Sequence, residues 1–179
     1  MTLTPLTDAR TLIDHDPQHR ALRGLARRLG ELPTKARPDE RLQVVVDLAR
    51  ELTGAAYGAL AVTDEADRTQ GFLTSGLTRE QLRRLRTPPQ GHGPLGSLRE
   101  DGRPVRYANV QDDDRAFGFP PRHPEMRALM GVALWANGVV RGSLYVANRE
   151  DGEPFDDDDE RLLTTLAAHA QLVIENDWY

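Results

Sequence analysis

The sequence predicts an α+β domain, in which terminal helices pack on one face of a central antiparallel sheet. Three observations carry this prediction. Apolar residues recur at helical spacing near both ends of the chain. Between these segments lie short apolar runs bounded by turn residues, as in β-strands. The last two runs flank Asn137-Gly138, the dipeptide that most strongly indicates a β-hairpin.

Helices are expected at both ends of the chain. A first helix begins near residue 17, after a capping aspartate, and Gly30 can end it. A second helix runs over about residues 38–53. The last helix follows a run of four aspartates, in which Asp156 is placed to cap the helix. The next three carboxylates, at 157–159, favour its first turn because the helix dipole is positive there.

The strands are expected between the second and the last helix. The runs that predict them lie at residues 57–63, 70–76, 104–110, 129–136 and 139–148. A short helix is expected from Thr78. The irregular stretch 111–127 is long for a compact domain, and loops of that length are usually functional or disordered. The chain is thus expected to hold a helical extension at 1–37 and one sensor-sized domain at 38–179.

Composition and charge exclude several function classes. The chain has 179 residues and no cysteine, which removes disulfides, thiolate metal sites and thiol chemistry. Its net charge of −5 argues against a nucleic-acid partner, because phosphate binding favours a basic face. It lacks the run of about 18 apolar residues that spans a membrane and shows no signal peptide. A cytoplasmic protein without a membrane partner is expected.

One histidine stands out, in the stretch GFPPRHPEMRALMGV at residues 118–132. Pro121 and Pro124 restrict the backbone around His123 and hold it extended. Its neighbours are apolar and can wall a pocket: Phe117, Phe119, Met126, Leu129 and Met130. A fixed neutral imidazole in such a pocket suits an axial ligand to haem iron. A histidine that anchors the loop through a backbone hydrogen bond explains the same residues, and both interpretations stay open.

No catalytic set is evident, so the protein is not expected to be an enzyme. None of the serines lies in a G-x-S-x-G motif, and no H-E-x-x-H pair of histidines is present. The glycines at 91–96 match G-x-G-x-x-G in form. They follow a predicted helix and prolines, however, and a dinucleotide site needs them directly after a strand.

The order of elements and these motifs together resemble a GAF domain. The closest resemblance is to the haem-binding first GAF domain of the actinobacterial oxygen- and redox-sensing histidine kinases of the dormancy-response type. The stretches that carry it are YGALAV, GPLGSLREDGRPVRYANV, GFPPRHPEMRALMGVAL, GSLYVANREDGEPFDDDDERLLTTLAAHA and VIENDWY, over about residues 38–179.

The resemblance implies a sensor of a diatomic gas (O2, NO or CO) or of redox state, with haem b as cofactor. His123 falls on the proximal iron ligand. Tyr145 falls on a distal residue whose hydroxyl tunes oxygen against carbon monoxide and nitric oxide. A half-buried tyrosine that only fills the core is the alternative for Tyr145. For the chain, the alternatives are a haem-free GAF module that binds another small ligand or acts as a dimerising signalling domain, and a haem enzyme.

The sequence departs from this family in three places. Ala61 stands where some members carry a glutamate that blocks the route to the haem, so the route here is expected to be more open. Glu125 replaces a second proline after His123, which predicts a looser loop. No kinase, second GAF domain or other output domain follows within these 179 residues, which is expected of either an excised sensor module or a free-standing GAF protein. Haem propionates could pair with arginines, for which the candidates by charge are Arg99, Arg122 and Arg127.

A homodimer through the terminal helices is also expected. The helical positions before residue 30 and after residue 160 carry more apolar side chains than one sheet face is expected to bury. They are Leu22, Leu25, Leu29, Leu162, Leu163, Leu166, Ala170, Val173 and Ile174.

Overall fold

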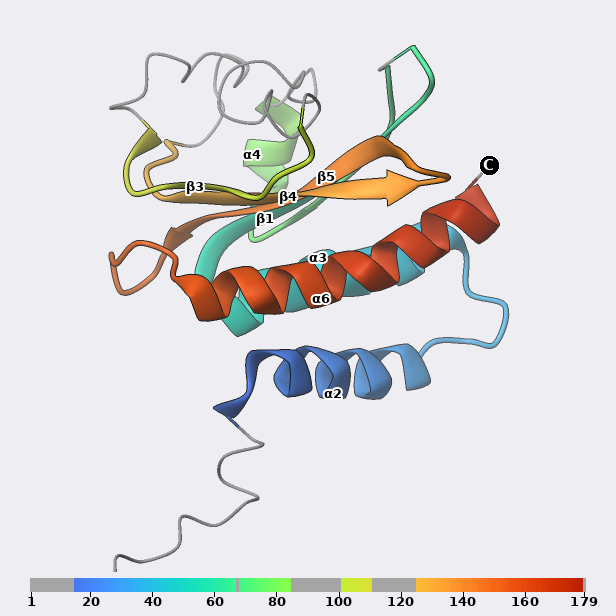
Figure 1. Cartoon of the computed structure of the whole chain (residues 1–179), viewed down its shortest axis with the longest axis horizontal. Helices are drawn as coiled ribbons and strands as arrows, with labels where there is room; N and C mark the ends of the chain where they lie inside the picture. Colours follow the sequence, from blue (N-terminus) through green and yellow to red (C-terminus); the bar gives the residue numbers. More distant parts are fainter. Residues whose placement is uncertain (1–14, 67, 85–100, 111–124, 179) are drawn as a thin grey trace, which may run out of the picture.

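The computed structural model of the chain describes residues 15–66, 68–84, 101–110 and 125–178 (Figure 1). The elements within these ranges follow the predicted order. They are α2 (Pro17–Gly30), α3 (Pro38–Thr53), β1 (Ala55–Thr63), β2 (Thr69–Ser75), α4 (Arg79–Arg84), β3 (Val105–Tyr107), β4 (Leu129–Ala136), β5 (Val139–Arg149), α6 (Asp157–Val173) and a π-helical turn η3 (Ile174–Trp178). None of the described helices is both long enough and apolar enough to cross a bilayer.

The five strands form one sheet in the order β2-β1-β5-β4-β3, and every neighbouring pair is antiparallel. This confirms the α+β class and the antiparallel sheet. Asn137 and Gly138 both have positive φ, at 52° and 79°. A tight hairpin needs this conformation because it matches the twist of the strands on either side. The hairpin expected from the Asn-Gly dipeptide is therefore confirmed.

Local signals place the ends of the helices as expected. The carboxylate of Asp156 accepts from the backbone N–H of Asp159 at 2.9 Å, and the Asp159 carboxylate accepts from Asp156 N–H at 3.0 Å. This reciprocal pair satisfies two donors that the first turn of α6 leaves open. Gly54 ends α3 in the left-handed conformation, at φ 68°.

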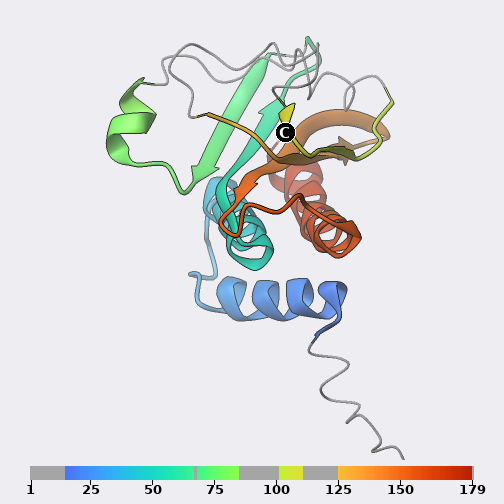
Figure 2. The same cartoon turned by 90° about the vertical axis from the view of Figure 1, so that its left-hand side faces the viewer.

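The helices α2, α3 and α6 form two layers on one side of the sheet (Figures 1 and 2). α3 and α6 lie on the sheet, and α2 packs against both of them on the side away from it. Ala21 and Leu25 of α2 are buried in this contact, and Gly24 lets the helix approach Leu48 of α3. The sequence predicted that the terminal helices would cover the sheet, which is true of α6 but not of α2.

The packing of α2 on α3 and α6 bears on the predicted homodimer, because that prediction rested on apolar surface that the sheet alone would leave uncovered on the terminal helices. The apolar positions named on α6 and η3 are all at most 3% exposed within a single chain, because α2 and the sheet cover opposite sides of the helix. Of the named positions on α2, Leu25 is buried and Leu22 is 57% exposed. Apart from the exposed Leu22 and the partly buried Leu29, these positions lack the surplus of apolar surface expected from the sequence, and the homodimer stays a prediction.

Gly142 on β5 provides a direct test of the sheet. A Cβ at this position would lie 2.0 Å from the carbonyl oxygen of Ala61 on β1, which is backbone and cannot swing away. We expect Gly142→Ala to lower the free energy of unfolding by about 3 kcal/mol, the upper end of the usual cost of overpacking. Denaturant unfolding followed by circular dichroism measures the change.

Gly30 is the matched control. A Cβ there meets no atom within 4 Å, and the residue lies inside α2. Alanine is the better helix former, so Gly30→Ala should raise the free energy of unfolding by about 0.5–1 kcal/mol. Equal effects of the two substitutions would contradict the close approach of β5 to β1.

Candidate functional site on the face of the sheet opposite α3 and α6

The two faces of the sheet carry two separate cores. On β5, Leu144 and Val146 join the core under the helices, whereas Tyr145 and Ala147 belong to a second cluster on the opposite face. This alternation follows from the strand geometry, in which successive side chains point to opposite sides. It confirms the prediction that Tyr145 faces away from the helix-packed residues on either side of it.

The centre of the face opposite α3 and α6 is made of small residues. We call this surface the platform and define it as Ala59, Ala61, Gly131, Ala133 and Ala147, with Tyr145 among them. Ala59, Ala133 and Ala147 are at most 6% exposed, and Ala61 is half-buried. Larger apolar side chains pack against the same cluster and are partly buried: Tyr57, Phe72, Val105, Tyr107 and Val140. Small side chains leave the strand backbone open to a flat ligand, and apolar surroundings favour its burial.

Tyr145 is the polar group of the platform. In the strand register it stands opposite Ala59 on β1 and Gly131 on β4, so its immediate neighbours are among the smallest residues of the sheet. It is 2% exposed, and this burial raises the pKa of its hydroxyl far above the usual value. The phenol therefore stays neutral and keeps its proton over the physiological range.

The structure brings together four of the predicted site residues. Tyr145, Met126 and Leu129 belong to the cluster on the face opposite α3 and α6, and Ala61 lies on the same face because it is two positions from Ala59 on β1. Met126 and Leu129 are at most 3% exposed.

The structure places Met130 on the face of the sheet opposite the one predicted. It is fully buried in the core under the helices, opposite Val146. The sequence grouped Met130 with Leu129, but neighbours on a strand face opposite sides, so Met130 does not share the platform. The remaining predicted residues, His123, Phe117 and Phe119, lie outside the described residues, as do the propionate candidates Arg99 and Arg122.

A half-open cavity of about 300 Å³ lies at one end of the sheet, and no sequence motif indicated it. Its lining comes from the end of β3, the start of β4 and the loop after β5: Ala108, Asn109, Arg127, Ala128, Asn148, Arg149, Gly152 and Glu153. Arg127, the third propionate candidate, borders this cavity. Its side chain is 71% exposed and forms an ion pair with Glu125 at 3.3 Å.

Asn148 fixes the wall of this cavity and the start of β4. Its φ of 59° is unusual for a residue other than glycine. In this conformation its side chain accepts from Arg127 N–H at 2.7 Å and donates to the carbonyl of Glu125 at 2.8 Å. The segment that enters β4, two residues after His123 in the sequence, is thereby tied to the end of β5.

A match to a family model over most of the chain shows its family. The family model described as "GAF domain" matches residues 35–175. The chain belongs to the GAF family. The matched range includes the complete five-stranded sheet, α3 and α6, and therefore the platform.

Solved GAF domains share this fold. The GAF domain of a phosphoenolpyruvate-protein phosphotransferase from Coxiella burnetii superposes with a TM-score of 0.69 at 22% identity, covering 88% of this chain and 94% of that one. The GAF domain of a putative sensor histidine kinase from Pseudomonas syringae pv. tomato gives 0.59 at 18% identity, over 96% and 94%.

A free methionine-R-sulfoxide reductase from Neisseria meningitidis, solved with its substrate, also superposes on this chain. Its TM-score is 0.64 at 16% identity, over 97% of this chain and 94% of that one. At these identities the likeness concerns the fold. The absence of cysteine from this chain excludes a thiol-dependent reductase chemistry.

Proposed function

We propose that this GAF domain is a signalling sensor module whose platform binds haem b, with His123 as the iron ligand and a diatomic gas or the redox state as the signal. The observation that carries the proposal is the platform itself: a buried face of small apolar residues around one neutral phenol.

The described residues fit a haem. A porphyrin is flat and largely apolar, and the small side chains of Ala59, Ala133 and Ala147 would let it approach the strand backbone closely. Met126 and Leu129 extend the same apolar cluster and would pack against it. When bound, haem supplies an iron that takes a diatomic gas or an electron. The chain supplies a ligand histidine, an apolar surface that excludes water, and the hydroxyl of Tyr145 as hydrogen-bond donor.

The proposed partners follow from this role. A sensor of this kind acts on an output domain, for which a histidine kinase is our first proposal, and the homodimer through the terminal helices belongs to the same proposal. We place this activity in the cytoplasm. The alternative, a haem-free GAF module with another small ligand or a purely dimerising role, uses the same platform without iron.

An absorption titration separates the two functions. Purified protein mixed with haem should develop a sharp Soret band that saturates at one haem per chain, and carbon monoxide should shift this band in the reduced protein. A broad band that rises without saturation indicates unspecific adsorption and would contradict the haem proposal. Apomyoglobin serves as the reference for specific binding, and haem in buffer without protein as the reference for the unbound pigment.

Ala61 tests the platform without disturbing the core, because it is the half-buried member of the set. We expect Ala61→Phe to lower haem affinity by about tenfold or more, since one extra ring occupies space next to Tyr145, and overpacking typically costs 1–3 kcal/mol. Ala61→Ser adds a single oxygen and is the matched control, with nearly unchanged affinity. Haem binding that is unaffected by phenylalanine at this position would place the ligand elsewhere.

A further inference from the structure

The C-terminal turn η3 is fastened to three other elements. Arg41 of α3 forms an ion pair with Asp177, at 3.0 Å between Nη1 and Oδ2. The carboxylate of Glu175 accepts from the backbone N–H of Asn137 in the β4–β5 hairpin at 2.9 Å. The ring of Trp178 lies 2.6 Å from the position that a Cβ on Gly71 of β2 would occupy, so only glycine admits the indole there.

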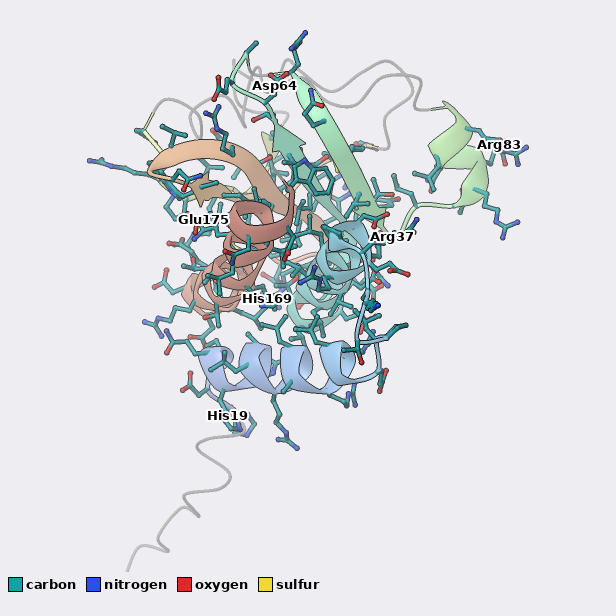
Figure 3. The ribbon with its side chains drawn as sticks, turned by 90° about the vertical axis from the view of Figure 1, so that its right-hand side faces the viewer. His19, Arg37, Asp64, Arg83, His169 and Glu175 are labelled. Atoms are coloured by element: carbon teal, nitrogen blue, oxygen red, sulfur yellow. The ribbon has the colours of Figure 1, made fainter. Side chains whose placement is uncertain are left out.

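Beside this turn, two polar atoms are buried without a hydrogen-bond partner among the described residues. They are Nε of Arg41 on α3 and Nε2 of His169 on α6. His169 lies in the layer formed by α3 and α6, above α2 (Figure 3). Burial lowers the pKa of His169, and the positive charge of Arg41 lowers it further. The imidazole is therefore neutral at neutral pH, within electrostatic reach of a guanidinium that the ion pair with Asp177 holds in place.

The other charges around His169 do not offset Arg41. From η3, the carboxylate of Asp177 is engaged by Arg41 itself. At the α2–α3 contact, Arg28 and Glu51 pair with each other. The buried strand residues that pack under the helices are mainly apolar, and the polar Ser75 on β2 is engaged by Arg50 of α3. Arg41 is thus the charge that His169 meets when it gains a proton.

We propose that protonation of His169 displaces Arg41 and thereby detaches the C-terminal turn η3 from α3. Protonation places a second positive charge against Arg41 and gives Nε2 a proton with no acceptor nearby. The repulsion is relieved when the Arg41 side chain moves toward solvent, which breaks its pair with Asp177. The turn then loses its tie to α3, and Trp178 leaves Gly71. This device is independent of the haem proposal, because neither its residues nor its test involve the platform.

The direction of the pH dependence follows from the lowered pKa. An imidazole in the unfolded chain titrates near 6.5. Because His169 in the folded protein binds its proton only at lower pH, its contribution to stability is present above about pH 6.5 and is lost as the pH falls. The release is therefore expected on the acidic side of neutrality.

Tryptophan fluorescence tests the release in the whole chain. The protein has two tryptophans, so Trp135→Phe leaves Trp178 as the only reporter. Between pH 8 and pH 5, we expect the Trp178 emission to shift to the red and its quenching by acrylamide to increase, with a midpoint below about 6.5. Far-UV circular dichroism should stay constant over the same range. In His169→Gln the transition should disappear, whereas His19→Gln, at a half-exposed position of α2, should retain it.

Two outcomes would overturn the proposal. One is the same transition in His169→Gln, which would assign it to a carboxylate. The other is constant Trp178 emission while the imidazole of His169, followed by NMR in the otherwise unchanged protein, gains its proton. Asp177→Asn gives a second check that needs no substitution at His169. It removes the ion pair, and we expect Trp178 to be released at every pH tested; an unreleased Trp178 would contradict the role of Arg41.

Discussion

His123→Ala is expected to remove the saturable Soret band of the haem-loaded protein. Loss of groups that merely support a metal ligand commonly costs 10- to 100-fold in affinity, so loss of the ligand itself should weaken haem binding by at least about 100-fold. The prolines on both sides of His123 pre-order the backbone, and no other residue of the loop offers an imidazole. Haem titration monitored by absorption, with circular dichroism to verify folding, measures the effect.

The control for this variant is His92→Ala, which removes the imidazole of the other glycine- and proline-rich stretch. It should leave the Soret band and the affinity unchanged. If His123→Ala keeps an unaltered spectrum and His92→Ala loses it, the ligand is His92. If both variants keep the spectrum, the iron is held by neither histidine, and the resemblance fails at its central residue.

The features that the sequence predicts correctly are those that depend on residues close together in the chain. The hairpin at Asn137-Gly138 and the cap at Asp156 depend on residues within a few positions of each other, and both are confirmed. The position of α2 depends on contacts between distant segments. Its apolar stripe shows that one face is buried, but the stripe is equally suited to a sheet or to a pair of helices. The third layer therefore could not be deduced from periodicity.

The candidate site also combines features that local sequence predicts with features that it does not. Alternation along β5 correctly placed Tyr145 opposite Leu144 and Val146. Apolar character alone groups Met130 with Leu129 and so predicts the wrong face for it. In the register of β4, Met130 stands opposite Val146 in the core under the helices. The left-handed conformation of Asn148 carries no sequence signal by itself, since asparagine adopts it in only a minority of positions.

Tyr145→Phe is expected to separate oxygen from carbon monoxide. Dioxygen becomes polarised when it binds and accepts a hydrogen bond well, whereas carbon monoxide gains much less from a donor. A hydrogen bond to a charged acceptor contributes about 1.5–3 kcal/mol, which corresponds to a roughly 10- to 150-fold change in an equilibrium constant. We expect the substitution to lower oxygen affinity, or to accelerate autoxidation, by a factor in this range. Carbon monoxide affinity should change by less than about threefold.

The position of the hydroxyl in the platform makes this test interpretable. Phenylalanine keeps the ring that packs between Ala59 and Gly131, so the sheet should fold unchanged. Because burial raises the pKa of Tyr145 far above its usual value, the hydroxyl remains a donor, and the ratio between the two proteins should be constant from pH 6 to about pH 9. Tyr57→Phe, a partly buried tyrosine of the same cluster, is the matched control and should alter neither gas. Equal losses for both gases would show that Tyr145 acts through packing, and no change for either would place it outside the ligand pocket.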